Sequence, residues 1–215
     1  MSSLGYQRIY RAIQETAGMS CERAFLSEGV VRSGGQPLID GTKRYYFGGS
    51  QGGIMGATYM AVTTDVLRGA LAVPGQPYGL LLPRSVDYDT FASFVSSTYP
   101  SPLDDQLLLG LIQMLWDRAE PTGFSAYVRS NPLPNTPAHE AMILVSIGDH
   151  QVTPLGAHVM ARAIGAKNMR PAVRSIYGID EVDSPFVGST ITEWDFGLPP
   201  APITNVPMRE GPDPH

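Results

Sequence analysis

Charged residues are scarce in this chain, and basic residues are scarcest. Only 16% of its 215 residues are charged, and 15 Lys and Arg stand against 20 Asp and Glu, which gives a formal net charge of -5. The basic residues are scattered along the sequence, whereas a nucleic-acid-binding domain gathers them on one surface. The composition therefore argues against a nucleic-acid partner.

Cysteine is almost absent. The single cysteine, Cys21, excludes a disulfide within the chain and argues against a zinc site built from several cysteines. We expect Cys21 to be a partly buried small apolar side chain, and we expect the protein to need no metal or organic cofactor.

Long hydrophobic runs are missing as well. No stretch of 18 apolar residues occurs, and the first residues lack the apolar core of a signal peptide. We therefore expect no membrane span, and a cytoplasmic protein if Met1 is the native start.

The sequence does contain alternating strand and helix patterns, and its hydrophobic content of 43% is enough for one substantial core. Apolar runs within 43–47, 68–75, 141–149 and 189–196 predict strands, and residues 54–67 and 155–164 predict helices between them. This order predicts an α/β fold with a parallel sheet, right-handed crossovers and helices on both faces. Near the N-terminus, apolar side chains at helical spacing predict a core-packing helix over 4–17, and glycines predict turns near 34–37 and 40–41.

Residues 76–138 interrupt this alternation. They contain a predicted helix at 104–118, and the side chains expected on its buried stripe are Leu107, Leu108, Leu111, Ile112 and Leu115. An insertion of this length between core strands predicts a cap over the carboxyl edge of the sheet, with 1–75 and 139–215 forming the core. Three large side chains could line a pocket under the cap, although their spacing is more typical of core packing: Met114, Trp116 and Tyr127.

The stretch from 45 to 56 carries the strongest functional signal. A strand pattern ends in glycine, Ser50 follows, and further glycines precede a helix. Gly48-x-Ser50-x-Gly52 between a strand and a helix is the pattern of a nucleophile elbow, in which a strained turn lifts the serine hydroxyl above the sheet. The following helix directs its N–H groups at developing charge, so the Gln51 N–H is a candidate oxyanion donor.

A serine hydroxyl becomes nucleophilic when an imidazole takes its proton and a carboxylate orients that imidazole. Asp149 ends the strongest strand pattern, where parallel sheets place their chemistry, although it could instead cap the next helix. His215 follows the last predicted strand, which keeps the order of nucleophile, acid and base found in such hydrolases, so it is the preferred base. The alternatives are no catalytic histidine, or one of the other three, which are His139, His150 and His158.

Four stretches resemble the α/β-hydrolase family, and within it a group of bacterial serine hydrolases. They are Ser-Gln-Gly-Gly-Ile-Met-Gly at 50–56, Ile-Gln-Met-Leu-Trp-Asp-Arg at 112–118, Gly-Asp-His-Gln-Val at 148–152 and Arg-Glu-Gly-Pro-Asp-Pro-His at 209–215. The resemblance covers nearly all of the chain. It implies Ser50 as nucleophile, Asp149 as acid, His215 as base and the Gln51 N–H as half of the oxyanion hole. The family has several strands before the elbow and a helix after the histidine, so we expect this chain to be the carboxyl-terminal portion of a longer hydrolase, with an incomplete core.

Together these features predict a serine hydrolase that cleaves small-molecule carboxylic esters through an acyl-enzyme. An amidase or peptidase with the same triad is a lesser alternative. The alternative from a different class is a non-catalytic, hydrolase-derived fragment or binding module that keeps the fold.

Overall fold

The computed structural model describes residues 32–33, 36–37 and 43–215. The helix expected at 4–17, Cys21, and the glycines expected in turns at 34–35 and 40–41 lie outside these residues. The chain divides into two units, Met1–Lys43 and Arg44–His215. In the first unit, β1 (Arg32–Ser33) pairs with β2 (Gln36–Pro37) in an antiparallel sense.

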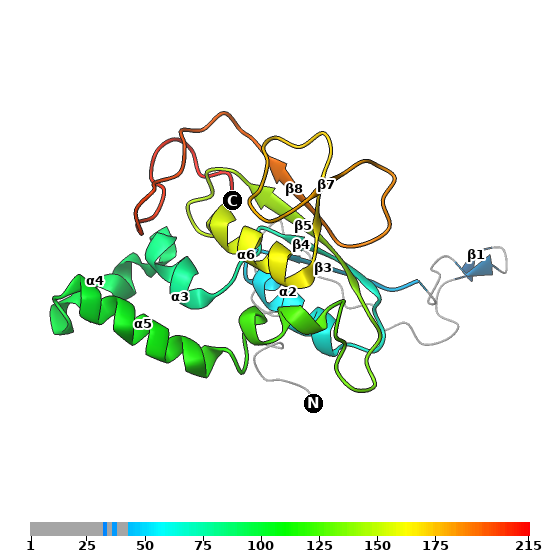
Figure 1. Ribbon diagram of the computed structural model, residues 1–215, viewed down its shortest axis with the longest axis horizontal. Coiled ribbons are helices and arrows are strands. Elements are labelled where there is room, and N and C mark those ends of the chain that lie inside the picture. The colour runs from blue at the N-terminus through cyan, green and yellow to red at the C-terminus, as the bar shows by residue number, and fades with distance from the viewer. Residues whose placement is uncertain (1–31, 34–35, 38–42) are drawn as a thin grey trace. The chain divides into compact units, whose positions relative to one another are not determined.

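The second unit is built on a six-stranded sheet in which every strand is parallel to its neighbours (Figure 1). The order across the sheet is β3-β4-β5-β8-β6-β7. In chain order the strands are β3 (Tyr45–Gly49), β4 (Arg68–Ala72), β5 (Glu140–Ser146), β6 (Lys167–Met169), β7 (Glu181–Val182) and β8 (Thr190–Trp194). The α/β fold with a parallel sheet is confirmed. The last strand of the chain lies inside the sheet, between β5 and β6.

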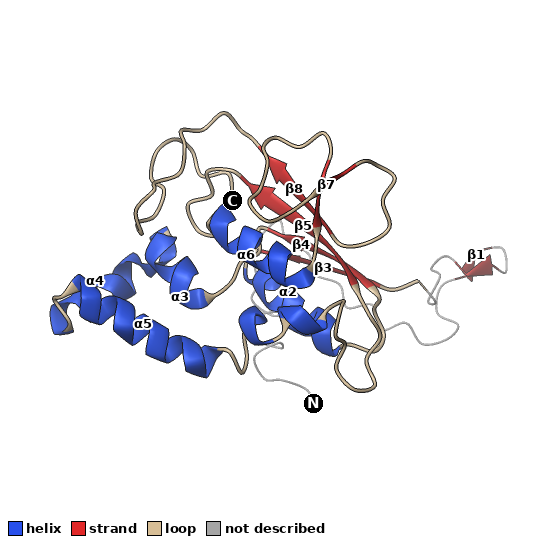
Figure 2. Ribbon diagram, in the orientation of Figure 1, coloured by secondary structure: helices blue, strands red, loops and turns tan. Residues whose placement is uncertain are grey.

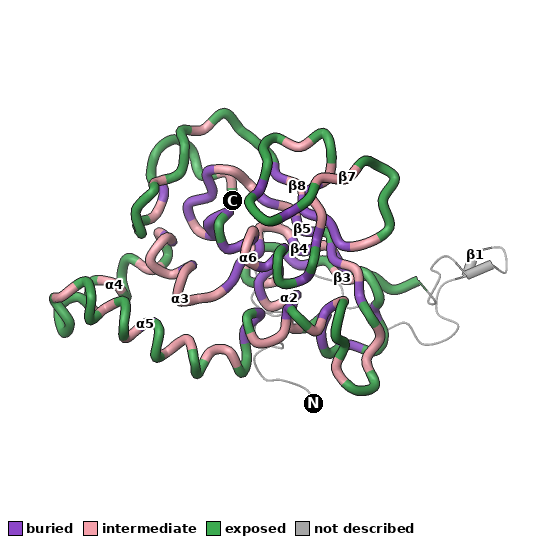
Figure 3. The backbone as a smooth tube through the Cα atoms, viewed as in Figure 1, coloured by how far each residue is buried: buried purple, intermediate pink, exposed green. Residues whose placement is uncertain are grey.

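Two helices pack on one face of this sheet. The helix α2 (Gln51–Val62) joins β3 to β4, and α6 (Pro154–Ile164) follows β5; both lie in front of the strands in Figure 2. Alternate residues of each strand point toward these helices, and the buried residues gather where helices and strands meet (Figure 3). The largest fully buried apolar side chains of this core are Met60, Leu71, Ile143, Met160, Ile164 and Ile191.

The opposite face of the sheet carries no helix within residues 43–215. Alternate residues of the strands point there, and Phe47 is 72% exposed, while Met142 and Trp194 expose about half of their surfaces. Within residues 43–215 helices therefore cover one face only, and the expectation of helices on the other face stays a prediction. The order of strands and helices shows how the strands are joined, but it does not determine how many helices cover each face.

The connection from β4 to β5 is a largely helical insertion. It contains α3 (Tyr78–Leu81), α4 (Asp89–Thr98) and α5 (Pro102–Trp116), with short 3-10 helices at Leu82–Arg84, Val86–Tyr88, Pro121–Gly123 and Ser125–Tyr127. The stripe predicted to be buried on α5 is wrong in part, because Leu107, Leu111 and Leu115 are exposed and Leu109 is buried instead. The helix α5 is apolar on several sides, so spacing alone did not identify the side that packs.

The segment after β8, residues 195–215, contains no helix or strand and returns to the carboxyl ends of the strands (Figure 1). On the way it contacts the insertion. Arg209 donates hydrogen bonds of 2.6 and 2.9 Å to the Asp89 carboxylate at the start of α4, and Asn205 Nδ2 donates to Gln106 of α5 at 3.3 Å. These contacts hold the C-terminal segment beside the insertion.

Candidate functional site

Ser50 occupies a sharp turn between β3 and α2. Its φ is 54° and its ψ is -123°, a backbone conformation that residues other than glycine rarely adopt. Its N–H donates to the Ala72 carbonyl of β4 at 3.0 Å, and its own carbonyl accepts from the Ile54 N–H at 2.9 Å. A serine that precedes a helix usually caps it with its hydroxyl, but the Ser50 hydroxyl makes no capping bond. The hydroxyl therefore remains available for another partner.

Close contact between β3, β4 and α2 explains the glycines around Ser50. A Cβ on Gly53 would collide with the Ala72 carbonyl oxygen, and a Cβ on Gly48 would collide with the Gly52 carbonyl oxygen. A Cβ on Gly52 would meet only the Tyr46 hydroxyl, at an ordinary 3.9 Å. Of the two glycines in the Gly-x-Ser-x-Gly motif, Gly48 has no room for a side chain and Gly52 does. Gly53 lies outside the motif but has no room for a side chain either.

The neighbouring strand ends in a similar backbone conformation. Val73, directly after β4, has a φ of 42°, which is rare for a β-branched residue. Its N–H donates to the Leu144 carbonyl of β5 at 2.8 Å. Two strained residues, Ser50 and Val73, thus end neighbouring strands at the same edge of the sheet. Strain of this kind is concentrated at functional sites.

Asp149 lies just beyond the carboxyl end of β5 and is 2% exposed. Its Oδ1 accepts the N–H groups of Gln151 and Val152 at 2.8 and 2.7 Å, and its Oδ2 is 2.9 Å from Nδ1 of His215. Burial raises the pKa of this carboxyl above its ordinary value, and the hydrogen bonds to it oppose that rise. The alternative role of Asp149 as a helix cap is wrong, because the N-cap of α6 is Thr153.

The structure separates the four histidines. Within the described residues, His215 is the histidine whose ring bonds Asp149; its side chain is 16% exposed, and its Nε2 has no hydrogen-bond partner among those residues. The other three rings bond elsewhere, His139 to the Thr63 carbonyl, His150 to the Glu210 carbonyl and His158 to the Glu193 carboxylate. The structure therefore brings together Asp149 and His215. Ser50 stands at the same sheet edge, with β4 between its strand and β5.

Gln51 begins α2, so its N–H has no acceptor within the helix. Its side chain makes a contact that the sequence did not predict, because Nε2 donates to the Tyr78 hydroxyl of α3 at 2.6 Å. The Tyr78 ring packs edge-on against Trp116 at the end of α5, with centroids 5.6 Å apart. The insertion thus borders the elbow through these two aromatic side chains. Of the other two candidate pocket residues, Met114 is 67% exposed and Tyr127 packs against the core.

A second contact joins the insertion to the loop that carries Asp149. The Val86 N–H donates to the carbonyl of His150 at 3.0 Å, directly after Asp149. The His150 N–H of the same loop donates to Asp213 at 3.2 Å. Asp213 was not predicted as a site residue, although it lies two residues before His215. No local pattern predicts its bonds to His150 and Gln151, because these two residues are more than 60 positions away along the chain.

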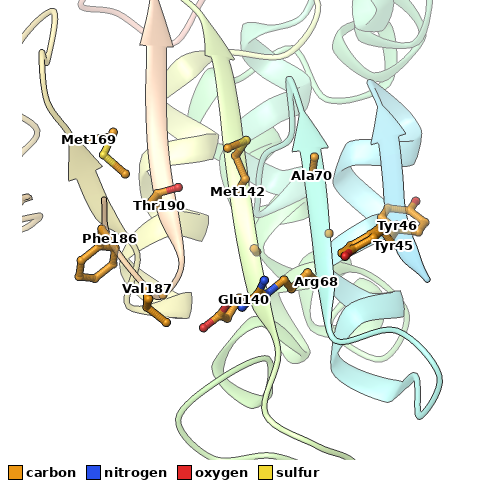
Figure 4. Close-up of a pocket in the computed structure, with 13 residues that line it drawn as sticks. Tyr45, Tyr46, Arg68, Ala70, Glu140, Met142, Met169, Phe186, Val187 and Thr190 are labelled. Atoms are coloured by element: carbon orange, nitrogen blue, oxygen red, sulfur yellow. Dashed lines mark hydrogen bonds and ion pairs between the residues drawn. The ribbon is translucent and has the colours of Figure 1, made fainter. Parts of the chain in front are cut away.

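A hollow of about 450 Å³ lies on the uncovered face of the sheet (Figure 4). Its lining includes Tyr45, Arg68, Glu140 and Thr190, each the first residue of its strand. Figure 4 shows these side chains near the amino ends of the strands, with Phe186 and Val187 beside them. Ser50 and Asp149 follow the opposite, carboxyl ends. Because parallel α/β sheets bind ligands at their carboxyl ends, we do not assign this hollow to the candidate site.

Residues 43–215, with the two short strands before them, hold no group of three or more metal-ligating side chains. No helix in that part of the chain is both long and apolar enough to cross a bilayer.

Comparisons of the chain with protein-family models, with curated proteins and with solved structures gave no significant match. The parallel α/β fold therefore rests on the geometry described above, and these comparisons assign neither a family nor an activity to the chain.

Proposed function

We propose that the chain carries the catalytic residues of a serine hydrolase of the α/β-hydrolase type, which cleaves carboxylic esters with Ser50 as nucleophile, His215 as base and Asp149 as acid. The observation that carries the proposal is the 2.9 Å contact between His215 Nδ1 and the buried Asp149 carboxylate. The strained backbone of Ser50 at the same sheet edge supports it. Strands are about 4.8 Å apart, so groups that follow β3 and β5 are about 10 Å apart along that edge. The proposal requires the His215 imidazole, bonded to Asp149, to bridge that gap.

In the acylation step, Ser50 Oγ attacks the ester carbonyl carbon while its proton passes to Nε2 of His215. Asp149 holds the proton on Nδ1, which leaves Nε2 free to accept, and it stabilises the imidazolium that forms. The carbonyl oxygen becomes an oxyanion near the unpaired N–H of Gln51 at the start of α2. The intermediate collapses, and the alcohol leaves with the proton from His215.

In the deacylation step, water attacks the acyl carbon and gives a proton to His215 Nε2. The second tetrahedral intermediate then releases the acid, and the proton returns to Ser50 Oγ. Every bond change is made by the serine, the imidazole and water. The proposed reaction therefore requires no metal or organic cofactor.

The insertion borders the substrate side in this proposal. Tyr78 and Trp116 place two aromatic rings beside the residue that follows Ser50. Apolar side chains at this position suit an ester with an uncharged acyl or alcohol group. The non-catalytic alternative retains the same fold and would bind a ligand beside the insertion without hydrolysing it.

Burst kinetics with p-nitrophenyl acetate test the proposal. The full chain should release one equivalent of p-nitrophenol rapidly and then turn over more slowly as the acyl-enzyme is hydrolysed. Ser50→Ala should abolish the burst, and His215→Gln should slow both phases. If the folded protein gives neither burst nor turnover, and behaves as Ser50→Ala does, the non-catalytic alternative replaces this proposal. The matched p-nitroanilide separates an esterase from an amidase.

A further inference from the structure

The Asp213 carboxylate joins the two chain segments that carry Asp149 and His215. Its Oδ1 accepts the backbone N–H of His150 at 3.2 Å and the backbone N–H of His215 at 3.1 Å. Its Oδ2 accepts a hydrogen bond from the Gln151 side-chain amide at 2.9 Å. A single side chain thus contacts the two residues that follow the acid and the residue that carries the imidazole.

Gln151 is held between two carboxylates. Its backbone N–H donates to Asp149 at 2.8 Å, while its side chain donates to Asp213. The His150 ring makes a further contact with the C-terminal segment, since its Nε2 is 3.4 Å from the Glu210 carbonyl oxygen. Besides the Asp149–His215 contact, hydrogen bonds from His150 and Gln151 therefore join the loop after β5 to the C-terminal segment.

We propose that Asp213 is a positioning residue, which holds the C-terminal segment against the loop after β5 so that the His215 ring keeps its contact with Asp149. The catalytic consequence of this role rests on the proposed function. The placement of the His215 ring does not rest on the proposed function, because it is argued only from the hydrogen bonds of Asp213 and Asp149.

The ionised form of Asp213 suits this role. Partial burial would raise the pKa of the carboxyl, but the hydrogen bonds from Gln151, His150 and His215 lower it overall. A carboxylate can accept on both oxygens at once, whereas an amide can accept on one only. Replacing the carboxylate by an amide therefore removes one of the three bonds and changes little else in shape.

The first test is Asp213→Asn. The amide oxygen can still accept the two backbone N–H groups, but the amide NH2 then faces the NH2 of Gln151. We expect kcat for p-nitrophenyl acetate to fall about 10- to 100-fold with little change in KM, because a displacement of about 1 Å at a catalytic group has an effect of this size. The matched control is Asp195→Asn. Asp195 accepts the Gly197 N–H at 2.8 Å, as Asp213 accepts the His215 N–H, but it makes no hydrogen bond with Asp149 or His215.

A charge exchange makes the test specific. Gln151→Glu added to Asp213→Asn restores an acceptor opposite the asparagine amide, so the double variant should recover most of the lost kcat. Gln151→Glu alone places two carboxylates against each other and should lower kcat as Asp213→Asn does. A purely structural role would lower the melting temperature of the single variants without this pattern of loss and recovery.

The ring itself can be observed without turnover. In NMR spectra, the Nδ1 proton of His215, assigned by its loss in His215→Gln, should exchange faster with water in Asp213→Asn than in the unmodified chain. An unchanged His215 signal together with an unchanged kcat overturns the proposal, as does a loss of kcat that the double variant does not recover. If the chain hydrolyses no ester, the His215 signal alone decides the role of Asp213, and the failure falls on the proposed function.

Discussion

The two halves of the candidate site are held by different forces. The nucleophile half, from β3 through Ser50 into α2, is fixed by close backbone contact, and its neighbours Gly48 and Gly53 have no room for a Cβ. The acid–base half, made of the loop after β5 and the C-terminal segment, is fixed by hydrogen bonds among carboxylates, imidazoles and backbone N–H groups. Steric fit does not respond to pH, but carboxylates and imidazoles do.

The two halves should therefore respond to different kinds of substitution. A larger side chain at Gly48 or Gly53 in the nucleophile half should act through folding, because the strands and α2 cannot move apart without losing core contacts. A substitution in the acid–base half should act mainly on the reaction, because hydrogen bonds hold this half and each contributes only about 1 kcal/mol to stability.

In the acid–base half, the largest effect on the reaction is expected from Asp149→Asn. The asparagine amide favours the wrong imidazole tautomer and removes the charge that stabilises the imidazolium, so kcat should fall about 10⁴-fold while the protein stays folded. The measurement is steady-state hydrolysis of p-nitrophenyl acetate, with circular dichroism to check the fold. Activity within tenfold of the unmodified chain would mean that the Asp149–His215 pair has no catalytic role.

The nucleophile half is tested by a pair of glycine substitutions. Gly53→Ala should lower the free energy of unfolding by about 3 kcal/mol, because its Cβ would collide with the Ala72 carbonyl oxygen of β4. Gly52→Ala is the control, since a Cβ there fits and alanine is the better helix former. Urea unfolding measures both. Equal stabilities for the two variants would show that close backbone contact does not fix the elbow.

Acid should also weaken a group of charged contacts next to the acid–base half. On β8, next to β5, Glu193 accepts hydrogen bonds from His158 at 2.7 Å and from Arg174 at 2.7 and 2.8 Å. Burial alone would raise the pKa of Glu193, but these partners lower it to about 2, against an ordinary 4.5. The stabilisation is therefore present above pH 4.5 and lost as the pH falls toward 2. It amounts to about 3 kcal/mol.

Glu193→Gln separates this contribution from other acid effects. The variant should be less stable than the unmodified chain at neutral pH, and the difference should shrink toward zero between pH 4.5 and 2. Urea unfolding at several pH values gives both curves. Parallel curves through this range would exclude Glu193 as the source.

The smallest effect is expected where the two halves meet the insertion. Tyr78→Phe removes the hydroxyl that accepts from Gln51 at 2.6 Å and keeps the ring against Trp116. We expect a loss of about 1 kcal/mol in unfolding free energy and a change in kcat of only a few fold. Tyr177→Phe is the control, because Tyr177 is 91% exposed. A loss of kcat as large as that from Asp149→Asn would assign Tyr78 a direct part in the reaction.

Elements with strong local signals were predicted from the sequence. The strands β3, β4, β5 and β8 and the helices α2, α5 and α6 all occur where apolar runs or helical spacing indicated them, with ends shifted by a few residues. The strands β6 and β7 were missed because they have three and two residues, too few for a periodic pattern. The four-residue helix α3 was missed for the same reason, and the ten-residue helix α4 was also not assigned within the insertion.

Features that depend on distant partners were not predicted. The side of α5 that packs and the face of the sheet that helices cover are decided by neighbours, not by spacing within one element. At the site, the sequence predicted that Asp149 orients His215, and the two side chains are in contact at 2.9 Å. It missed Asp213 and Tyr78, whose roles come from hydrogen bonds to His150, Gln151 and Gln51 across the fold. The part played by Ser50 stays a prediction.

The central claim is that the Ser50 hydroxyl is activated by the imidazole bonded to Asp149. Covalent labelling of the folded full chain with a fluorophosphonate, followed by mass spectrometry of its peptides, tests it most directly. The account predicts a single adduct on Ser50, formed far more slowly in His215→Gln and in Asp149→Asn. A folded chain that takes no adduct, or takes one at the same rate without His215, would contradict it.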